Sequence, residues 1–249
     1  MRVAALYDVH GNLPALEAVL EEVERERPDA IVFGGDIVAG PMPRETLARV
    51  RDLGGRAHLI RGNADRIALE LRRGLRREGE GLGDWVGKEL TDEEAELLAS
   101  LPLTVTLDVG GLGPTCFCHA TPRDDEEIFL ERDADEVVAE MLSGTDERTI
   151  VCGHTHMQVD RRVGRWRVVN AGSVGMPYED EPGARWALLG PDVSLRRTDY
   201  DREEAARRFR QIVGSRSGDS SVIENVLRPP PREEVLDFFE QLAAEQRGA

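Results

Sequence analysis

Short apolar runs that each end in a polar side chain are the feature that most constrains the fold of this chain. Five runs, VAALY, AIVF, AHLI, TCFC and TIVC, each have the length and composition of one buried strand. Between the first three lie helical patterns: Leu13 to Arg25 carries apolar residues at helical spacing, with Asn12 and Pro14 as its start, and TLARVRDL is a second helix. Strands that alternate with helices in this way predict a sheet covered by helices.

Residues 66–101 interrupt this alternation. The segment is charged and punctuated by glycine, and it closes with TDEEAELLASLP, a helix whose N-cap is Thr91 and whose capping box is completed by Glu94. Strands then resume, and their density after residue 100 predicts a second sheet packed on the first. The segments are LTVTLDV, TCFC, TIVC, RWRVVN, RWALLG and VSLRRT. We therefore expect one domain over residues 1–200, with a mostly helical excursion at 66–101.

The tail, residues 201–249, has a different character. One helix is expected to run to about Val213, and GSRSGDSS after it is predicted to be a flexible joint. A proline stop, RPPP, precedes an amphipathic helix with Val235, Phe238, Phe239 and Leu242 on one stripe. We interpret this as a C-terminal helical extension that packs on the domain. The alternative is that the last helix forms a homo-oligomer or partner contact.

Composition excludes several classes of protein. The N-terminus, MRVAALYDVHGN, is too short and too polar for a signal peptide or a membrane span, so we expect a cytoplasmic protein with no membrane contact. A formal net charge of −16 repels nucleic-acid backbones, which argues against non-specific nucleic-acid binding. Three cysteines fit a reducing compartment, and because Cys116, Cys118 and Cys152 lie within apolar runs, we interpret them as buried strand residues rather than metal ligands.

Side chains able to bind a metal follow all five apolar runs. They are Asp8 and His10 after the first, Asp36 after the second, Asn63 after the third, His119 after the fourth, and His154 and His156 after the fifth. Ligands of α/β sheets bind outside the carboxyl ends of the strands, so neighbouring strands that point the same way would bring these side chains together. His58, inside AHLI, falls outside this set and is interpreted as a core or rim histidine.

The candidate ligand set has two carboxylates, four imidazoles and one amide oxygen. That is too many donors for one ion and suits two ions that share a bridge. Oxygen and imidazole donors favour Mn, Fe, Ni, Zn or Co. Each residue taken alone would fit a turn, a cap or a core position, so the prediction depends on the combination.

The series DVHGN, GGD, GNAD, H and GHTH resembles the calcineurin-like metallophosphoesterase superfamily, and more narrowly its small bacterial phosphodiesterases. The stretches DVHGNLPALEAVL and VNAGSVGMP support the resemblance, which covers residues 1 to about 200. It implies a four-layer α-β-β-α sandwich of two mixed sheets flanked by helices. It also implies two divalent ions, one held by Asp8, His10 and His156 and one by Asn63, His119 and His154, with Asp36 as the bridge.

The activity implied by this resemblance is hydrolysis of a small phosphate ester, in the first place a phosphodiester, by a metal-bound hydroxide that attacks phosphorus. The charge of two ions explains how an acidic protein can bind an anionic substrate. Asn63 and Asn12 are expected to hold the non-bridging oxygens, and no catalytic residue is expected beyond the metal ligands. Many family members have a histidine at the position of Ala64. Alanine cannot act as a general acid, so substrates with good leaving groups, such as aryl diesters or anhydrides, are expected.

Two alternatives stay open at this point. A eukaryotic retromer subunit resembles the same branch, also lacks that histidine and works as a scaffold, so a metal-containing interaction scaffold with little activity is one alternative. The other is a phosphomonoesterase, a protein phosphatase or a nucleotide pyrophosphatase on the same site. The excursion at 66–101 would shape the rim of the pocket. Its arginines, Arg66, Arg72 and Arg73, would meet a substrate phosphate or, as we favour, lie in solvent.

Overall fold

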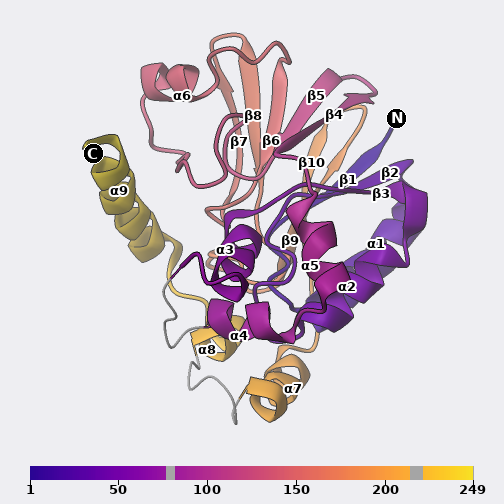
Figure 1. Ribbon diagram of the computed structural model, residues 1–249. Coiled ribbons are helices and arrows are strands. Elements are labelled where there is room, and N and C mark those ends of the chain that lie inside the picture. Colours follow the sequence, from indigo (N-terminus) through magenta and orange to yellow (C-terminus); the bar gives the residue numbers. More distant parts are fainter. Residues whose placement is uncertain (77–81, 214–220, 249) are drawn as a thin grey trace.

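Two five-stranded sheets stand face to face in the computed structural model, which describes residues 1–76, 82–213 and 221–248 (Figure 1). The first sheet has the order β10-β9-β1-β2-β3. Its strands are β1 (Val3–Leu6), β2 (Ala30–Phe33), β3 (Ala57–Leu59), β9 (Ala184–Leu189) and β10 (Val193–Thr198). β1, β2 and β3 are parallel, whereas β9 runs antiparallel to both β1 and β10, so the sheet is mixed.

The second sheet is also mixed and has the order β4-β5-β6-β8-β7. Its strands are β4 (Thr104–Val109), β5 (Gly113–Cys118), β6 (Thr149–Cys152), β7 (Gln158–Val163) and β8 (Trp166–Ala171). β5, β6 and β8 are parallel, and an antiparallel strand closes each edge. The prediction of two packed sheets is confirmed, with one refinement: RWALLG and VSLRRT, which follow the second sheet in sequence, return to the first sheet as β9 and β10.

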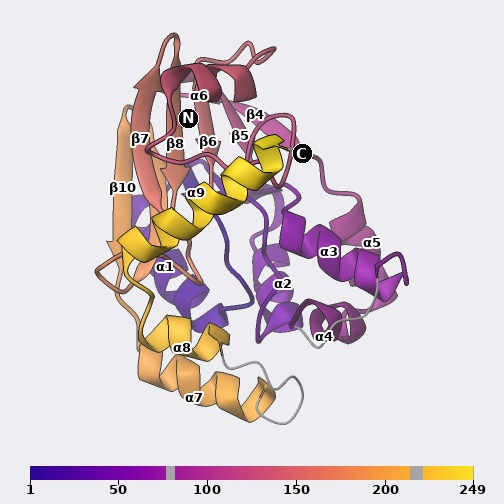
Figure 2. The ribbon, with the colours of Figure 1, turned by 90° about the vertical axis from the view of Figure 1, so that its left-hand side faces the viewer.

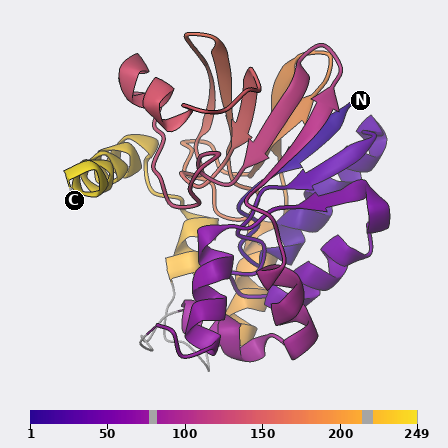
Figure 3. The same cartoon turned by 45° about the horizontal axis from the view of Figure 1, so that its top comes forward.

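Helices cover the outer faces of both sheets, and Figure 3 shows the sheets between them. The helices before the second sheet are α1 (Leu13–Glu26), α2 (Pro43–Arg51), α3 (Asn63–Arg72), α4 (Leu82–Glu89) and α5 (Asp92–Ala99), with a short 3₁₀ turn, η1 (Gly54–Arg56). The later helices are α6 (Asp135–Met141), α7 (Arg202–Val213), α8 (Ser221–Leu227) and α9 (Arg232–Gly248).

Three apolar layers separate these elements because successive strand residues point to opposite faces. In β1, Ala4 and Leu6 face outward and pack with α1 and α2, while Val3 and Ala5 face the second sheet. The outer face of the second sheet, which includes all three cysteines, packs under α6. The cysteines are buried and free, as predicted. The predicted four-layer α-β-β-α sandwich is the observed architecture.

Local sequence signals account for the starts of two helices. The Asn12 side chain accepts a hydrogen bond from the backbone N–H of Ala15 at 3.1 Å and caps α1. The predicted capping box of α5 is present, since Thr91 accepts from the backbone of Glu94 and the Glu94 carboxylate accepts from the backbone of Thr91. The described part of the 66–101 excursion is helical: α3, α4 and α5 occupy it.

The described part of the tail, residues 201–213 and 221–248, runs across the domain as three helices. α7 and α8 pack together with Leu13 and Met42, and α9 lies over the second sheet (Figure 2). Residues 214–220 of the predicted flexible joint lie outside the described residues. The apolar stripe of α9 faces the chain's own domain, except for Phe238, which is 56% exposed.

Besides the short 3₁₀ turn η1, three described elements were not predicted from the sequence. β7 has arginines and an aspartate on a half-exposed edge strand, α6 is only seven residues long, and α8 is equally short. Each gives too weak a periodic signal to be read locally. His58 lies half-buried in β3. Within the described residues, no helix is both long and apolar enough to cross a membrane.

Candidate metal centre

The predicted ligands lie at the carboxyl ends of parallel strands from both sheets. β1, β2 and β3 lead into Asp8, Asp36 and Asn63, while β5 and β6 of the second sheet lead into His119 and His154. Backbone hydrogen bonds join these strand ends to one another. Within the first sheet, the N–H of Asp8 donates to Gly35 at 3.2 Å, and within the second, the N–H of Gly153 donates to His119 at 2.9 Å. The sandwich therefore brings loops from five separate segments to one edge.

Five of the seven candidate ligands have a left-handed backbone, with φ between 48° and 67°. They are Asp8, His10, Asp36, His154 and His156. This conformation is uncommon outside glycine, although Asp and His tolerate it better than most residues. Strain of this kind persists only where surrounding contacts enforce it, and it concentrates at functional sites. Four of these five side chains, those of Asp8, His10, Asp36 and His156, belong to the two groups of close donor atoms.

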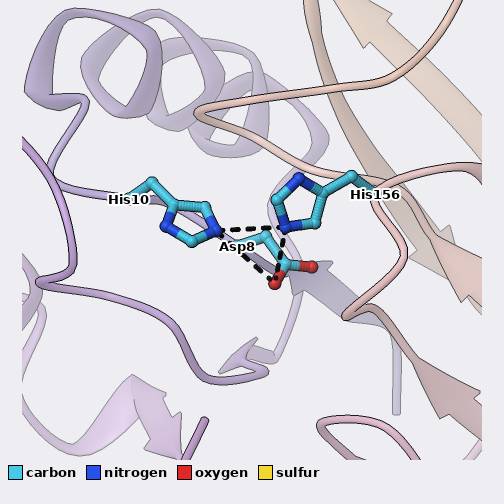
Figure 4. Close-up of side chains that lie close together, drawn as sticks. All are labelled: Asp8, His10 and His156. Carbon is cyan, nitrogen blue, oxygen red and sulfur yellow. Dashed lines mark hydrogen bonds and ion pairs between the residues drawn. The ribbon is translucent and has the colours of Figure 1, made fainter. Parts of the chain in front are cut away.

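The first group of donors is Asp8, His10 and His156 (Figure 4). The Nε2 atoms of the two histidines are 3.1 Å apart, and Oδ1 of Asp8 lies 3.4 Å from Nε2 of His156 and 4.0 Å from Nε2 of His10. Donor atoms that bind one ion at about 2.0–2.2 Å lie roughly 3.0–4.2 Å from one another. The spacing in this group therefore fits a shared cation.

The second group is centred on His119 and Asp36. Nε2 of His119 lies 2.9 Å from Oδ1 of Asn63, 3.5 Å from Oδ2 of Asp36 and 3.9 Å from Oδ1 of Asp8. Oδ2 of Asp36 is also 3.8 Å from Nε2 of His10, which belongs to the first group. Asp36 therefore lies between the two groups, as a bridge must. Asp8 Oδ1 likewise reaches both groups, which the sequence did not indicate.

His154 is oriented differently from the other histidines. Its ring meets His119 edge-on at 5.2 Å between centroids, and its Nε2 lies 3.2 Å from the backbone carbonyl oxygen of Glu126. That hydrogen bond places the ring hydrogen on Nε2 and leaves the lone pair on Nδ1. Unlike the other three histidines, His154 is in neither of the two groups of described donors whose atoms lie within 4.8 Å of one another. Burial, together with the charge of His119, lowers the pKa of His154 to about 4, so this ring is neutral near pH 7.

Backbone carbonyls orient the other three imidazoles. Nδ1 of His10 lies 3.0 Å from the oxygen of Ala39, Nδ1 of His119 lies 2.8 Å from that of Gly34, and Nδ1 of His156 lies 2.7 Å from that of Met176. A carbonyl fixes the hydrogen on Nδ1 and turns the lone pair of Nε2 toward the centre. Such pairing is usual around histidines that bind metals.

The buried charges of the centre call for a cation. Asp8 is fully buried, and its Oδ1 has no hydrogen-bond partner among the described residues, while Oδ2 accepts from the backbone N–H of His154 at 2.9 Å. Burial alone would raise the pKa of Asp8, but His156, His119 and His10 lower it below the usual range, so the group is ionised. A buried, ionised and unpaired carboxylate oxygen is costly unless a cation binds it. The donor set thus fits divalent ions.

The surroundings of His119 also indicate a bound cation. Both of its ring nitrogens face oxygen atoms, those of Gly34 and Asn63, so a neutral ring cannot satisfy both. Burial opposes a charge on the ring, but Asp36 and Asp8 outweigh it and raise the pKa of His119. A proton on Nε2, or a cation in its place, resolves the conflict.

Close packing explains a glycine beside the ligands. A Cβ atom at Gly153 would lie 2.3 Å from Oδ2 of Asp8 and 2.7 Å from the Tyr7 ring. The backbone of the GHTH loop thus approaches the Asp8 carboxylate as only glycine permits, and this approach lets the next N–H donate to that carboxylate.

Several supporting residues were missed by the sequence reasoning. Buried Asp65 accepts from the backbone N–H groups of Ile37 and Val38 at 3.1 and 3.0 Å and so fixes the loop of Asp36. Asn170 donates to the Gly153 carbonyl at 2.7 Å and steadies the GHTH loop. Both are short polar residues beside apolar runs, and only the fold shows what they bind.

The contacts of Asn12 and of two arginines differ from those expected from the sequence. Asn12 caps α1, and its amide donates to the Gly175 carbonyl and the Tyr200 hydroxyl, so its buried side chain has no amide hydrogen left for a substrate. Arg66 is not a solvated residue: its guanidinium pairs with Asp125 and with Glu126, each at about 3 Å. Arg72 likewise donates to the Gly87 carbonyl and to Asp92.

This fold and this cluster of buried carboxylates and imidazoles define a metallophosphoesterase type of protein. The profile of the calcineurin-like phosphoesterase superfamily domain matches residues 1–190, and the chain belongs to this superfamily.

Three comparisons illustrate its relatives. A crystal structure of a metallophosphoesterase from Sphaerobacter thermophilus superposes with a TM-score of 0.75 and 26% identity, over 92% of this chain and 100% of that one. An uncharacterized protein of Methanocaldococcus jannaschii is 27% identical over 235 residues, which are 86% of this chain and 93% of that one. A symmetrical bis(5'-nucleosyl)-tetraphosphatase of a Janthinobacterium species is 34% identical over 112 residues, which are 43% of this chain and 41% of that one. Membership of this family indicates a phosphoesterase hydrolase.

Proposed function

We propose that this chain is a dinuclear metal-dependent phosphoesterase that hydrolyses phosphodiesters with good leaving groups. The observation that carries the proposal is the place of Asp8 Oδ1, a buried oxygen without a hydrogen-bond partner in the described structure. It lies 3.4 to 4.0 Å from the Nε2 atoms of three imidazoles, those of His156, His119 and His10. A cluster of imidazoles around a buried anionic oxygen is suited to cations.

The residues divide into two binding groups, and two carboxylates border both groups. Asp8, His10 and His156 would hold one ion, and Asn63, His119 and Nδ1 of His154 the other. Asp36 and Asp8 face both groups. When bound, two divalent ions would neutralise phosphoryl oxygens and lower the pKa of water, which supplies the nucleophile. The imidazoles must be neutral to bind the ions, so acid is expected to weaken binding.

Arg61 would supply positive charge beside this centre. It lies two positions before Asn63, and its Nε donates to Asp125 at 3.0 Å, which fixes the guanidinium while the side chain stays 36% exposed. The exposed edge of a fixed guanidinium suits a phosphate oxygen. We propose that Arg61 and Asn63, rather than Asn12, orient the substrate.

Ala64 restricts the choice of substrate. Its backbone N–H donates to Oδ1 of Asp36 at 2.8 Å, and its methyl group is half-buried. This position therefore orients the bridging carboxylate but has no proton for a leaving group. Without general-acid assistance, which is worth roughly 10²–10⁴-fold, aryl diesters and phosphoanhydrides should be cleaved faster than alkyl esters.

Hydrolysis of a nucleotide phosphoanhydride is the second candidate. The match to symmetrical bis(5'-nucleosyl)-tetraphosphatases favours it, because the name of those relatives states a nucleoside polyphosphate substrate. A phosphate leaving group also needs little protonation, which agrees with alanine at position 64.

Metal analysis combined with a substrate panel tests both candidates. Protein purified with Mn²⁺ should retain about two ions per chain and should hydrolyse bis(p-nitrophenyl) phosphate faster than p-nitrophenyl phosphate. Diadenosine tetraphosphate in the same panel tests the second candidate. Protein that holds two ions but leaves every ester and anhydride intact would favour the scaffold alternative instead.

A further inference from the structure

The C-terminal helix α9 contacts the loops behind both histidines of the GHTH motif. It lies across the second sheet in Figure 2, and its Val235, Leu236 and Ala243 pack on Ile128 and Leu130. Those two residues belong to the irregular segment 120–133, which connects His119 to α6. The position of this segment therefore depends on α9.

The Glu126 carbonyl is the point where α9 reaches the metal centre. This oxygen accepts from Nε2 of His154 at 3.2 Å and from the side-chain amide of Gln246, on α9, at 3.0 Å. A carbonyl oxygen has two lone pairs, so it can serve both donors at once. The group that orients His154 is thus itself held in place by the last turn of α9.

Charged contacts hold the same segment on either side of Glu126. Arg247, next to Gln246, donates to the Ile128 carbonyl at 3.2 Å and to Asp133 at 2.8 Å. From the other direction, Arg66 of α3 pairs with the carboxylate of Glu126 at 2.9 Å. Segment 120–133 is therefore clamped between α3, which begins at Asn63, and α9.

A second contact leads from α9 to His156. The Tyr178 ring stacks on the His156 ring at 4.9 Å between centroids, with 19° between the planes, and Phe239 of α9 packs against Tyr178 at 6.4 Å. Arg232, at the start of α9, pairs with Glu179 at 2.8 Å. The helix thus braces the loop 176–180, whose Met176 carbonyl orients His156.

We infer that α9 is a positioning element of the metal centre, and that Gln246 acts through the Glu126 carbonyl to hold His154 with Nδ1 toward the second ion. This inference rests on the proposed function, because it assumes that His154 binds a metal. Without Gln246 the carbonyl has one anchor fewer and the His154 ring gains rotational freedom. The second ion should then bind more weakly, while the first ion, held by Asp8, His10 and His156, is affected less.

Titration of the full-length, metal-depleted chain with Mn²⁺ tests this role. For Gln246→Ala we expect the dissociation constant of one of the two sites, the one that includes His154, to rise about 2- to 10-fold, as for loss of one hydrogen bond, while that of the other site changes less. Replacing Gln246 and Arg247 together should raise the constant of the His154 site about 10- to 100-fold, the range for outer partners of a metal ligand. Gln246→Lys, which keeps a donor of similar reach, should restore binding.

The controls separate positioning from stability. Gln241→Ala removes the same side chain from an exposed position of the same helix and should leave both dissociation constants unchanged. The metal-free Gln246→Ala protein should unfold close to the wild-type temperature, because only one exposed hydrogen bond is lost. Two Mn²⁺ ions bound to Gln246→Ala with wild-type affinity would overturn the inference. A wild-type chain that binds no Mn²⁺ would overturn the proposed function, and the inference with it.

Discussion

Asp8→Asn should reverse the order of stability between variant and wild type when metal is added. In the metal-free protein, Oδ1 of Asp8 is buried, has no hydrogen-bond partner among the described residues and faces the lone pair of His156 Nε2 at 3.4 Å. An amide NH₂ in that place could donate to Nε2, while the remaining oxygen keeps the N–H of His154. An unsatisfied buried polar group costs about 1–3 kcal/mol, so at pH 8, where the positive charge that favours the Asp8 carboxylate is largely lost, metal-free Asp8→Asn should be as stable as wild type or more stable by up to that amount.

Mn²⁺ changes the comparison through mass action. An ion present at 100 times its dissociation constant stabilises the folded state by about 2.7 kcal/mol per site, which in a chain of this size raises Tm by roughly 5–11 °C. Asp8 borders both groups of donors, so Asp8→Asn should lose most of this gain. Wild type then becomes the more stable protein.

Asp65→Asn is the matched control, since Asp65 is also a buried aspartate near the centre. Asp65 accepts two backbone N–H groups, and the substitution would turn an amide NH₂ toward one of them. Burial and the charge of Asp36 raise the pKa of Asp65 to about 7, so the comparison belongs at pH 8, where the wild-type carboxylate is mostly ionised. We expect a loss of about 1–3 kcal/mol with or without metal.

Thermal and urea unfolding of the three proteins, with EDTA and with Mn²⁺, provide the assay. The reasoning fails if metal-free Asp8→Asn is destabilised as much as Asp65→Asn, because Asp8 would then serve the fold rather than a cation. It fails equally if Mn²⁺ raises the Tm of Asp8→Asn as much as that of wild type.

Three further substitutions test other parts of the centre. Gly153→Ala sets a Cβ 2.3 Å from Oδ2 of Asp8, so we expect about 1–3 kcal/mol of destabilisation by urea unfolding and weaker Mn²⁺ binding by titration. Ala64→His should speed cleavage of poor-leaving-group diesters more than of aryl diesters, and equal effects in kcat/KM would contradict the explanation given for alanine. Burial raises the pKa of Asp125, but hydrogen bonds and charge from Arg66 bring it below the usual value. The resulting stability is complete above the unfolded pKa of about 3.9 and is lost as pH falls through the folded pKa, so the advantage of wild type over Asp125→Asn in urea should shrink from pH 5 to pH 3.

Gly55→Ala provides the control for Gly153→Ala. A Cβ at Gly55 meets no heavy atom within 4 Å, so Gly55→Ala should leave both stability and Mn²⁺ binding close to wild type. Comparable losses in the two variants would show that crowding at Asp8 is not the cause.

Much of the fold could be predicted from the sequence because the patterns that mark its strands and helix starts are local. Four-residue apolar strands such as Ala30–Phe33, the Asn12 cap and the Thr91 capping box each depend on neighbours within one turn or one strand. β7 was not predicted because it is a half-exposed edge strand with charged residues, so its sequence lacks an apolar pattern. It forms a strand because it pairs with β8.

The sequence by itself determined which donors exist and that each follows a strand, since residue chemistry and strand ends are both properties of short segments. Only the tertiary structure decided which atoms face the centre. Nε2 or Nδ1 of a histidine is selected by a carbonyl from another part of the chain: Ala39 for His10, and Glu126 for His154. The same holds for Asn12, whose amide is used by Gly175 and Tyr200, and for Gln246. Such pairs lie up to 188 positions apart, so no local pattern can encode them; only the packing of the two sheets and α9 creates them.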